Sequence, residues 1–246
     1  MFKKIFMNFV VLASGRGSRL NKFTKNKPKC LTVIKKNKTL LDYISQNFHK
    51  KDNKIISTGY KSNLIEKHLS DKSINYVRNE NYLKTNMVES LMLCKKKLKR
   101  GNLIIVYGDI YFDPKIIKKI KKIKGNVIAV NSNWFKSWKQ RYSTLDKIKE
   151  DAEDLITSKG KIKSIGNKIG KKLPNFQYMG ILKIEEKTFY KLEKYYRGIN
   201  NKKISLTHFI NQTIKAKITN YKYSVFKNYW YEIDNLSDLK YLKRNI

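Results

Sequence analysis

The chain has 246 residues, of which 41% are hydrophobic and 12% aromatic, so it can bury a sizeable core and is not a disordered protein. Lysine and arginine number 55 against 19 acidic residues, a formal net charge of +36, which indicates an anionic partner such as a nucleotide, phosphate, nucleic acid or anionic lipid. Two cysteines and three scattered histidines exclude a disulfide scaffold and argue against a cysteine- or histidine-based metal centre.

The first half of the chain alternates strand-like and helix-like segments. Strands are expected at 5–12, 54–57, 74–77, 103–107 and 127–130, and helices at 40–48, 63–69, 86–98 and 114–125. Alternation with nearly continuous apolar strands predicts an α/β fold with a Rossmann-like, mostly parallel mixed sheet flanked by helices.

The second half has a different pattern. Strands are expected at 161–165, 176–184, 218–224 and 229–233, and helices at 185–195, 205–214 and 236–243. We therefore expect a single domain over 1–246, with a nucleotide-binding half at 1–130 and an acceptor-binding half at 131–246.

The lysines are spread along the whole chain rather than gathered in one patch. In the segment 114–125, Ile116, Ile117, Ile120 and Ile123 form one apolar stripe with lysines on the other faces, as in a solvated helix that ends near Gly125. This dispersal favours ordinary surface lysines over a dedicated nucleic-acid patch, although a basic RNA-binding protein without catalysis stays open as an alternative.

Apolar runs are too short for a membrane span and no secretory signal is recognised, so a cytoplasmic location is expected.

A glycine-rich loop follows the first strand. Gly15 and Gly17 permit positive φ and let backbone N–H groups approach phosphate oxygens, while Arg16 and Arg19 can add planar donors. The loop is neither G-x-G-x-x-G, because Leu20 replaces the third glycine, nor a Walker A sequence. Taken alone, it could equally be a plain turn.

The continuation makes the loop specific. The stretch L-A-S-G-R-G-S-R-L-x3-T-x3-P-K-C-L at 12–31 resembles the signature of the sugar-phosphate nucleotidyltransferase family, except that Ser14 stands where Ala or Gly is usual. The resemblance implies that Lys29 and Arg19 act at the phosphates, where a fixed cation would neutralise developing charge. It also implies nucleotide binding by the loop residues Leu12, Ala13, Ser14, Gly15, Arg16 and Gly17. The alternative for Lys29 is one more surface lysine.

Two carboxylates follow apolar strands. Asp109 and Asp234 could meet at one rim of the sheet and hold Mg²⁺ on nucleotide phosphates. Gly108-Asp109 stands where the family has its metal aspartate, and E-I-D-x-x-x-D-L at 232–239 resembles its closing motif. Asp238 is expected in the first turn of a helix. The alternative for the pair is two solvated strand-end caps.

The segment 78–91 resembles the N-x-x-Y-x-x-x-N-x-x-S-L pattern of phosphocholine cytidylyltransferases. Asn86 and Ser90 lie four residues apart, so they share a helical face and could bond the base or ribose. Their alternative roles are a helix N-cap and a helix-surface serine.

Acceptor recognition is predicted from four further stretches. W-x-x-R at 138–141, E-D-A-E at 150–153 and I-x-x-I-G at 162–166 resemble cytidylyltransferases that act on phosphonates such as 2-aminoethylphosphonate, with a looser insertion at 143–149. Arg141 would pair with the phosphonate or phosphate, Asp151 or Glu153 would face an amine, and Trp138 could add a cation–π face. The segment 176–181 resembles the family's acceptor strand, with Tyr178 and Gly180 at the acceptor; Tyr178 could instead be a core residue.

The sequence therefore predicts a Mg²⁺-dependent transfer of CMP from CTP to a small phosphate or phosphonate acceptor, such as phosphocholine or 2-aminoethylphosphonate, with release of pyrophosphate. A sugar-1-phosphate enzyme that uses UTP or dTTP is the alternative within the family. A homodimer is kept open as the assembly.

Overall fold

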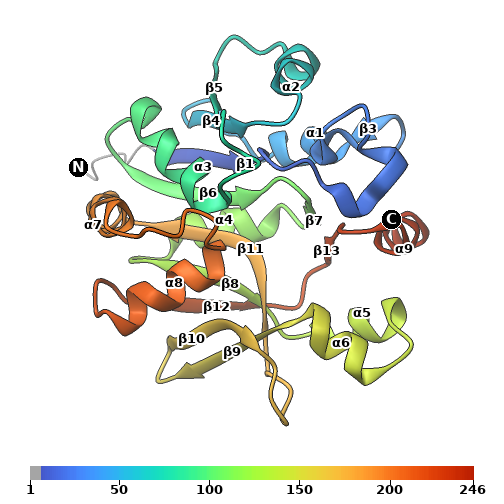
Figure 1. Cartoon of the computed structure of the whole chain (residues 1–246), viewed down its shortest axis with the longest axis vertical. Coiled ribbons are helices and arrows are strands. Elements are labelled where there is room, and N and C mark those ends of the chain that lie inside the picture. The colour runs from blue at the N-terminus through green and yellow to red at the C-terminus, as the bar shows by residue number, and fades with distance from the viewer. Residues whose placement is uncertain (1–6) are drawn as a thin grey trace.

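One nine-stranded sheet runs through the computed structural model, which describes residues 7–246 apart from the side chains of residues 21 and 22 (Figure 1). Its strands, in spatial order, are β5 (Ile74–Arg78), β4 (Asn53–Thr58), β1 (Met7–Leu12), β6 (Asn102–Tyr107), β11 (Gln177–Ile184), β8 (Val127–Asn131), β12 (Lys222–Phe226), β10 (Lys161–Lys168) and β9 (Glu153–Ser158). Residues 5 and 6 of the first predicted strand lie outside the described residues.

The sheet is mixed. Strands β5, β4, β1 and β6 are parallel, as are β8 and β12, whereas β11 runs antiparallel to both β6 and β8, and β10 runs antiparallel to β12 and β9. All six residues of β1 are buried, as expected for a parallel strand covered on both faces. The predicted mostly parallel mixed sheet is confirmed.

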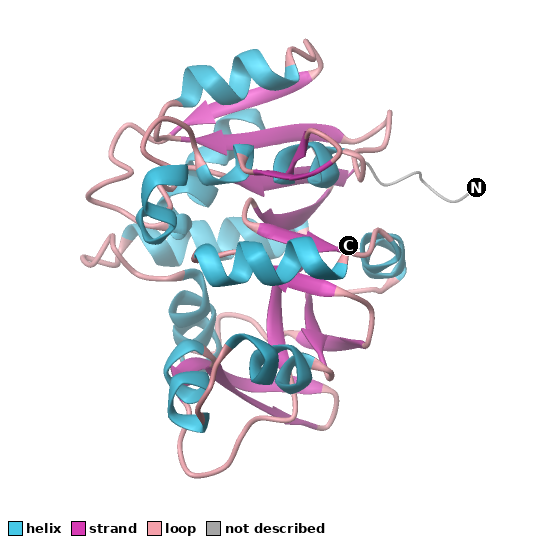
Figure 2. Ribbon diagram, turned by 90° about the vertical axis from the view of Figure 1, so that its right-hand side faces the viewer, coloured by secondary structure: helices cyan, strands magenta, loops and turns pink. Residues whose placement is uncertain are grey.

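Nine helices surround the strands in the part of the chain that the structure describes, and Figure 2 shows helices and strands in a view turned by 90° from Figure 1. They are α1 (Leu40–Ser45), α2 (Ser62–Leu69), α3 (Met87–Leu93), α4 (Lys115–Lys122), α5 (Trp134–Arg141), α6 (Leu145–Asp151), α7 (Glu186–Arg197), α8 (Leu206–Lys215) and α9 (Leu236–Asn245). Between residues 7 and 246, no helix combines the length and the apolar character that crossing a membrane would require.

Several boundaries differ from the sequence prediction. The segment 143–149, expected as a loose insertion, contains most of α6, which begins after Thr144 caps the N–H of Lys147 at 3.3 Å. The helix predicted at 86–98 ends as α3 at Leu93 and continues as a 3₁₀ turn. The strand predicted from 218 begins at Lys222, because the Ile218 N–H still bonds the Thr213 carbonyl at the end of α8.

A small two-stranded sheet sets the geometry of the site. Strand β13 (Trp230–Glu232) pairs antiparallel with β7 (Ile110–Phe112), and the Ile233 N–H donates to the Asp109 carbonyl at 3.1 Å. This pairing brings the end of the chain beside the end of β6.

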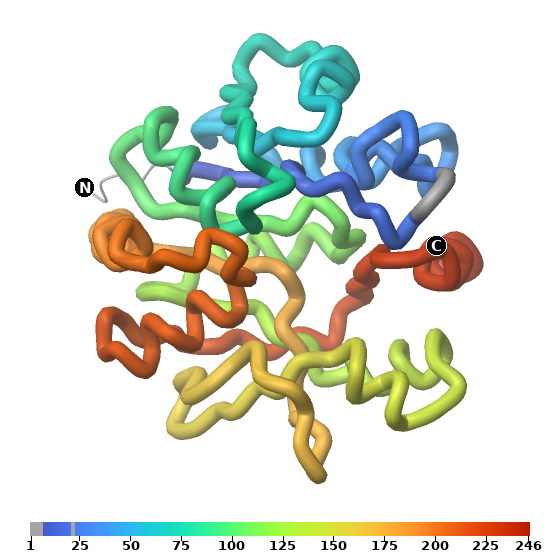
Figure 3. Tube along the Cα trace, in the orientation of Figure 1, coloured from blue at the N-terminus to red at the C-terminus, as the bar shows by residue number. Residues whose placement is uncertain are grey.

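A second apolar cluster packs α9 against the part of the chain that follows β1, and Figure 3 shows the red C-terminal helix beside this blue stretch. It joins residues of α9 to residues near the glycine-rich loop and near the hairpin of β2 (Val33–Lys35) and β3 (Lys38–Thr39): Leu20, Ile34, Leu40, Ile233, Leu239 and Leu242. Asp234 is thereby held next to the loop after β1.

Candidate active site

The loop after β1 is pinned between the neighbouring strands. The N–H of Ala13 donates to the Ser57 carbonyl at 2.9 Å, and the N–H of Gly108 donates to the Leu12 carbonyl at 2.9 Å. The Ser14 hydroxyl is buried 2.8 Å from the Ser57 hydroxyl, so the departure from the family signature is accommodated by one extra hydrogen bond.

Gly17 lets the loop lie directly on Lys29. Its φ is +68°, and a Cβ built on it would stand 2.7 Å from the Cβ of Lys29. The Thr24 hydroxyl donates to the Gly17 carbonyl at 2.8 Å and closes this turn. Gly15 does not use the positive φ that glycine permits, and a Cβ there would meet no atom within 4 Å. Its role is to leave open space above the backbone.

Lys29 joins the two carboxylates that the sequence singled out. It follows Pro28 in the 3₁₀ turn Lys29–Leu31, and its Nζ lies 2.8 Å from Asp109 Oδ2 and 2.6 Å from Asp234 Oδ1. Arg19 Nη2 reaches Asp234 Oδ2 at 3.1 Å. Two acidic side chains 125 positions apart in the chain thus converge on one point, rather than standing apart as solvated strand-end caps.

Electrostatics favour the charged forms of Lys29 and Asp234. Burial alone would lower the pKa of Lys29, but Asp109 and Asp234 outweigh it and raise that pKa above its usual value. Burial opposes ionisation of Asp234, yet the charge of Lys29 holds the pKa of the carboxyl below its usual range. The site is therefore built to hold cationic charge between two carboxylates.

A divalent ion would fit the same carboxylates. Asp109 Oδ1 is buried and has no hydrogen-bond partner among the described residues, although its other oxygen binds Lys29. In the described part of the chain, no group of three or more metal-binding side chains gathers. Two carboxylate donors, with phosphates and water completing the shell, match the way Mg²⁺ is held at nucleotide sites.

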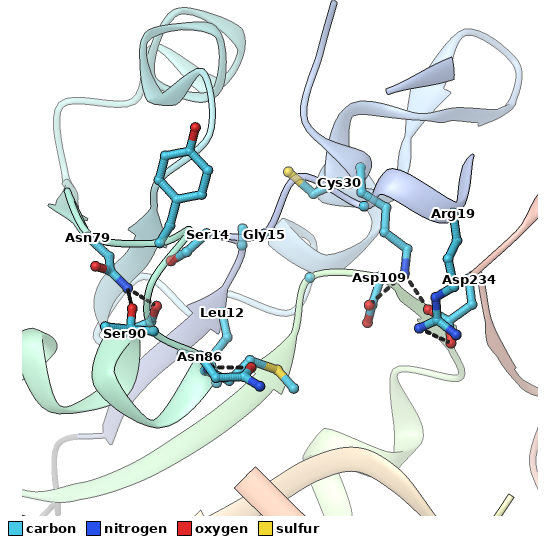
Figure 4. Close-up of a pocket in the computed structure, with 17 residues that line it drawn as sticks. Leu12, Ser14, Gly15, Arg19, Cys30, Asn79, Asn86, Ser90, Asp109 and Asp234 are labelled. Carbon is cyan, nitrogen blue, oxygen red and sulfur yellow. Dashed lines mark hydrogen bonds and ion pairs between the residues drawn. The ribbon is translucent and has the colours of Figure 1, made fainter. Parts of the chain in front are cut away.

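The loop, Lys29 and the carboxylates line one cavity of about 230 Å³ (Figure 4). The predicted residues that line it are Leu12, Ala13, Ser14, Gly15, Gly17, Arg19, Lys29, Asn86, Ser90, Asp109 and Asp234. Arg16 is not among its lining residues; it is exposed, and its guanidinium lies 5.6 Å from the centre of the Tyr60 ring. The predicted phosphate contact of Arg16 thus has no support from its position.

The other end of this cavity is polar, and the sequence predicted only Asn86 and Ser90 there. The buried amide of Asn79 donates to the Ser90 hydroxyl at 2.9 Å and to the Thr85 hydroxyl at 3.0 Å, and its oxygen accepts the Asn81 N–H. Asn86 is the N-cap of α3, and its amide also donates to the Lys203 carbonyl at 3.2 Å, so its polar atoms already have protein partners. Ser90 and Asn79 are therefore better placed than Asn86 to bond a nucleotide. The sequence signal for Asn79 was an asparagine at the end of a strand.

A second cavity, of about 300 Å³, lies on the other side of the carboxylates and shares Arg19, Met87, Asp109 and Asp234 with the first. Its remaining lining residues are Tyr107, Trp138, Glu150, Asp151, Glu153, Gln177, Tyr178, Gly180, Ser205, Thr207 and Glu232. They include the predicted acceptor residues Asp151, Tyr178 and Gly180. Burial raises the pKa of Glu153, and burial together with Asp234 raises the pKa of Glu232 well above its usual value.

Gly180 shapes this cavity by backbone geometry. It has φ of +70° where the pairing of β11 with β8 is interrupted, and a Cβ there would lie 3.0 Å from the Tyr107 ring. Tyr107 and Tyr178 meet edge to face with centroids 5.6 Å apart. Tyr178 is therefore both a core residue and part of the cavity wall, and a tyrosine ring fills the space beside the Gly180 backbone.

Arg141 differs from its predicted place. It lines neither cavity: its side chain is 3% exposed, and its Nε donates to Asp238 Oδ1 at 2.9 Å. The predicted direct pairing with an acceptor phosphate is not what this geometry provides, because the guanidinium is covered and already matched by a buried carboxylate.

Comparisons with known proteins identify the family and the fold of the chain. A family model described as Nucleotidyl transferase matches residues 8–246. A CTP:phosphoglutamine cytidylyltransferase from Campylobacter jejuni is 32% identical over 253 residues, covering 95% of this chain and 98% of that protein. Among solved structures, the inositol-1-phosphate CTP transferase from T. maritima matches with a TM-score of 0.74 and 21% identity, covering 99% of this chain and 97% of that one.

A further solved structure, the CTP:phosphocholine cytidylyltransferase from Streptococcus pneumoniae, matches with a TM-score of 0.73 and 20% identity over 98% of this chain and 99% of that one. At these identities the two structures support the fold alone. The family model and the Campylobacter relative show more: the chain belongs to the nucleotidyl transferase family. It is an enzyme, which sets aside the alternative of a non-catalytic RNA-binding protein.

Proposed function

We propose that this enzyme transfers CMP from CTP to a small phosphorylated acceptor and releases pyrophosphate. The observation that carries the proposal is that two cavities meet at Asp109, Asp234 and Arg19, with Lys29 between the carboxylates. The nucleotide would occupy the cavity beneath the glycine-rich loop, and the acceptor the cavity between Trp138, Tyr178 and Glu232.

Each residue has a role in this arrangement. The open backbone at Gly15 receives the phosphates, and the cations of Arg19 and Lys29 neutralise charge that develops at the attacked phosphorus. Asp109 and Asp234 would hold Mg²⁺, which when bound supplies further charge neutralisation on the phosphates. The acceptor oxygen is already anionic near neutral pH, so no general base is needed, and positioning supplies much of the acceleration.

We expect a strong preference for CTP in a pyrophosphate-release panel of CTP, UTP, dTTP, ATP and GTP. The named activity of the Campylobacter relative supports CTP. The Ser90 hydroxyl accepts a hydrogen bond from Asn79, so its proton is free to donate, and cytosine presents an acceptor at N3 where uracil has an N3–H donor. A preference for UTP or dTTP would instead assign the chain to sugar-1-phosphate chemistry.

A variant sharpens this test. In Asn79→Asp the new carboxylate would take the Ser90 proton, so Ser90 would offer the nucleotide only lone pairs. We expect the CTP-to-UTP ratio of kcat/KM to fall about tenfold. Thr85→Val serves as the matched control, because Thr85 bonds the same amide but already donates its proton to the Asn81 carbonyl at 2.9 Å. An unchanged ratio in Asn79→Asp would contradict the assignment of Ser90 to the base.

The acceptor carries a positive charge in this proposal, because its cavity is acidic. Six of the chain's 19 acidic residues line it: Asp109, Glu150, Asp151, Glu153, Glu232 and Asp234. Among the described residues that line it, Arg19 is the only basic one, although the net charge of the chain is +36. Glu153 and Glu232 have no ion-pair partner among the described residues, and burial disfavours their charged forms by raising the pKa of each, so a bound ammonium group would stabilise them as carboxylates. Phosphoglutamine, phosphocholine and 2-aminoethylphosphonate all carry a cationic nitrogen, and hexose 1-phosphates do not.

The acceptor prediction is tested with matched compounds. With CTP and Mg²⁺, 2-aminoethylphosphonate should give a kcat/KM at least about tenfold above that of propylphosphonate, which has a methyl group in place of the ammonium. Phosphoglutamine and phosphocholine are compared in the same assay to rank the cationic acceptors. Equal use of propylphosphonate, or better use of a hexose 1-phosphate, would contradict a cation-binding acceptor cavity.

A further inference from the structure

A buried ion pair connects α5 to α9 behind the site. Arg141 and Asp238 have side chains that are 3% and 0% exposed, and Arg141 Nε lies 2.9 Å from Asp238 Oδ1. Burying two charges is expensive, and such a pair often adds no stability over apolar residues of the same volume. The residues that Arg141 and Asp238 contact on each side therefore matter more than the stability that the ion pair itself contributes.

On one side the pair reaches the backbone of Asp234. The second oxygen of Asp238, Oδ2, accepts the N–H of Asp234 at 2.8 Å and the N–H of Asn235 at 3.0 Å. The Asp238 N–H in turn donates to Asn235 Oδ1 at 3.1 Å, which closes a capping box at the start of α9. Asp238 thus fixes the turn that presents the Asp234 carboxylate to Lys29.

On the other side the pair reaches the acceptor cavity. The Arg141 guanidinium carbon lies 4.4 Å from the centre of the Trp138 ring, and Trp138 Nε1 donates to Asp151 Oδ2 at 2.8 Å. Arg141 Nη2 is itself 3.8 Å from Asp151. Trp138 and Asp151 both line the acceptor cavity.

We infer that Arg141 is a positioning residue, which holds the Trp138–Asp151 wall of the acceptor cavity at a fixed distance from the turn that carries Asp234. This inference rests on the proposed function, because it assumes that the two cavities hold the two substrates. The reacting oxygen of the acceptor is then aligned with the attacked phosphorus through a guanidinium that touches neither substrate. A planar, multidentate group suits this task, since Arg141 uses its edge for Asp238 and its face for Trp138.

The test compares Arg141→Lys with the parent enzyme by steady-state kinetics. Lysine keeps the charge but cannot bond Asp238 and stack on Trp138 together, so kcat should fall about 10²-fold, as expected for a misplacement near 1 Å, and the acceptor KM should rise. The affinity for CTP, measured by calorimetry without acceptor, should stay within about twofold, because the nucleotide cavity lies on the far side of the carboxylates. Lys136→Met, an exposed change on the same helix, should leave all three values unchanged.

A second variant separates positioning from folding. Arg141→Met alone leaves Asp238 buried and unpaired, so its loss of stability would be uninformative. In the double variant Arg141→Met/Asp238→Asn, both charges are gone and the asparagine oxygen can still accept the two backbone N–H groups. It should keep the parent melting temperature within a few degrees and the parent CTP affinity, yet show the same kcat loss as Arg141→Lys.

Two results would overturn the inference, provided that the parent enzyme releases pyrophosphate from CTP. One is parent-like kcat and acceptor KM in Arg141→Lys. The other is an equal loss of CTP affinity and of kcat in both variants, which is what a general structural role produces. Absence of pyrophosphate release from the parent enzyme with every acceptor would contradict the proposed function itself.

Discussion

Asp109→Ala should abolish pyrophosphate release while the protein stays folded. Asp109 contributes one of the two carboxylates at the junction of the cavities, and its unpartnered Oδ1 is the oxygen best placed for a divalent ion. We expect turnover to fall on the order of 10³-fold or more, since loss of a single electrostatic stabiliser in a preorganised site costs about 10²–10³ and the ion would be lost with it. The assay is pyrophosphate release from CTP in Mg²⁺ with an amine-bearing acceptor.

The control for Asp109→Ala is Asp146→Ala, the same change at an exposed acid on α6 that lines neither substrate cavity. It should retain parent activity. Both variants are checked by thermal unfolding, because removal of Asp109 leaves Lys29 with Asp234 as its carboxylate partner and is expected to cost little of the fold. Activity of Asp109→Ala near the parent level would be incompatible with the proposed site.

Lys29→Met should separate catalysis from metal binding. Turnover should fall on the order of 10²–10³-fold, because the cation between the reacting phosphate and the carboxylates is gone. Binding of Mn²⁺ without nucleotide, followed by electron paramagnetic resonance, should instead become tighter. The ammonium now lies 2.8 and 2.6 Å from the same two carboxylates and competes with the ion for them.

Lys29→Arg is the conservative companion. It keeps the positive charge but brings a wider, planar group into a space that Gly17 closes from above, so it should restore only part of the turnover. Full activity in Lys29→Met, or weaker Mn²⁺ binding in that variant, would show that the ammonium neither neutralises charge in the reaction nor competes with the ion.

The part of the site that lies at strand ends was open to prediction from the sequence. Asp109 follows β6 of the main sheet, where the carboxyl ends of parallel strands meet. Asp234 instead follows β13 of the small two-stranded sheet, and the pairing of β13 with β7 brings it to the same point, as the shared contact with Lys29 shows. The glycine-rich stretch predicted a loop, and the structure adds that only Gly17 of its two glycines has a positive φ. The position of both aspartates after apolar strands made them recognisable, whereas their catalytic roles stay proposals.

The place of Arg141 in the structure was not predictable from the sequence. Arg141 was expected at the acceptor, but its place is decided by Asp238, which lies 97 residues further along and belongs to a different helix. Sequence spacing contains no information on that pairing. Helix α6 was not predicted because the many charges in its segment outweigh its two helix signals, the short apolar spacing from Leu145 to Ile148 and the cap at Thr144.

The surface charge and the cavity charge have opposite signs, which composition alone could not reveal. A net charge of +36 suggests that the whole surface attracts anions, yet carboxylates line the cavity beside Trp138. The overall charge can steer an anionic nucleotide and a phosphorylated acceptor toward the protein. In the proposed function, the local carboxylates would then distinguish acceptors by the cation at their other end.

Crystals grown with Mn²⁺ and a non-hydrolysable CTP analogue would show whether a divalent ion binds at the two carboxylates. Anomalous scattering should place one Mn²⁺ within coordination distance of a carboxylate oxygen of Asp109 and of Asp234, with the nucleotide phosphates completing its shell beside the Gly15 backbone. An ion bound elsewhere, or a nucleotide that leaves both carboxylates on Lys29 alone, would contradict metal binding by Asp109 and Asp234.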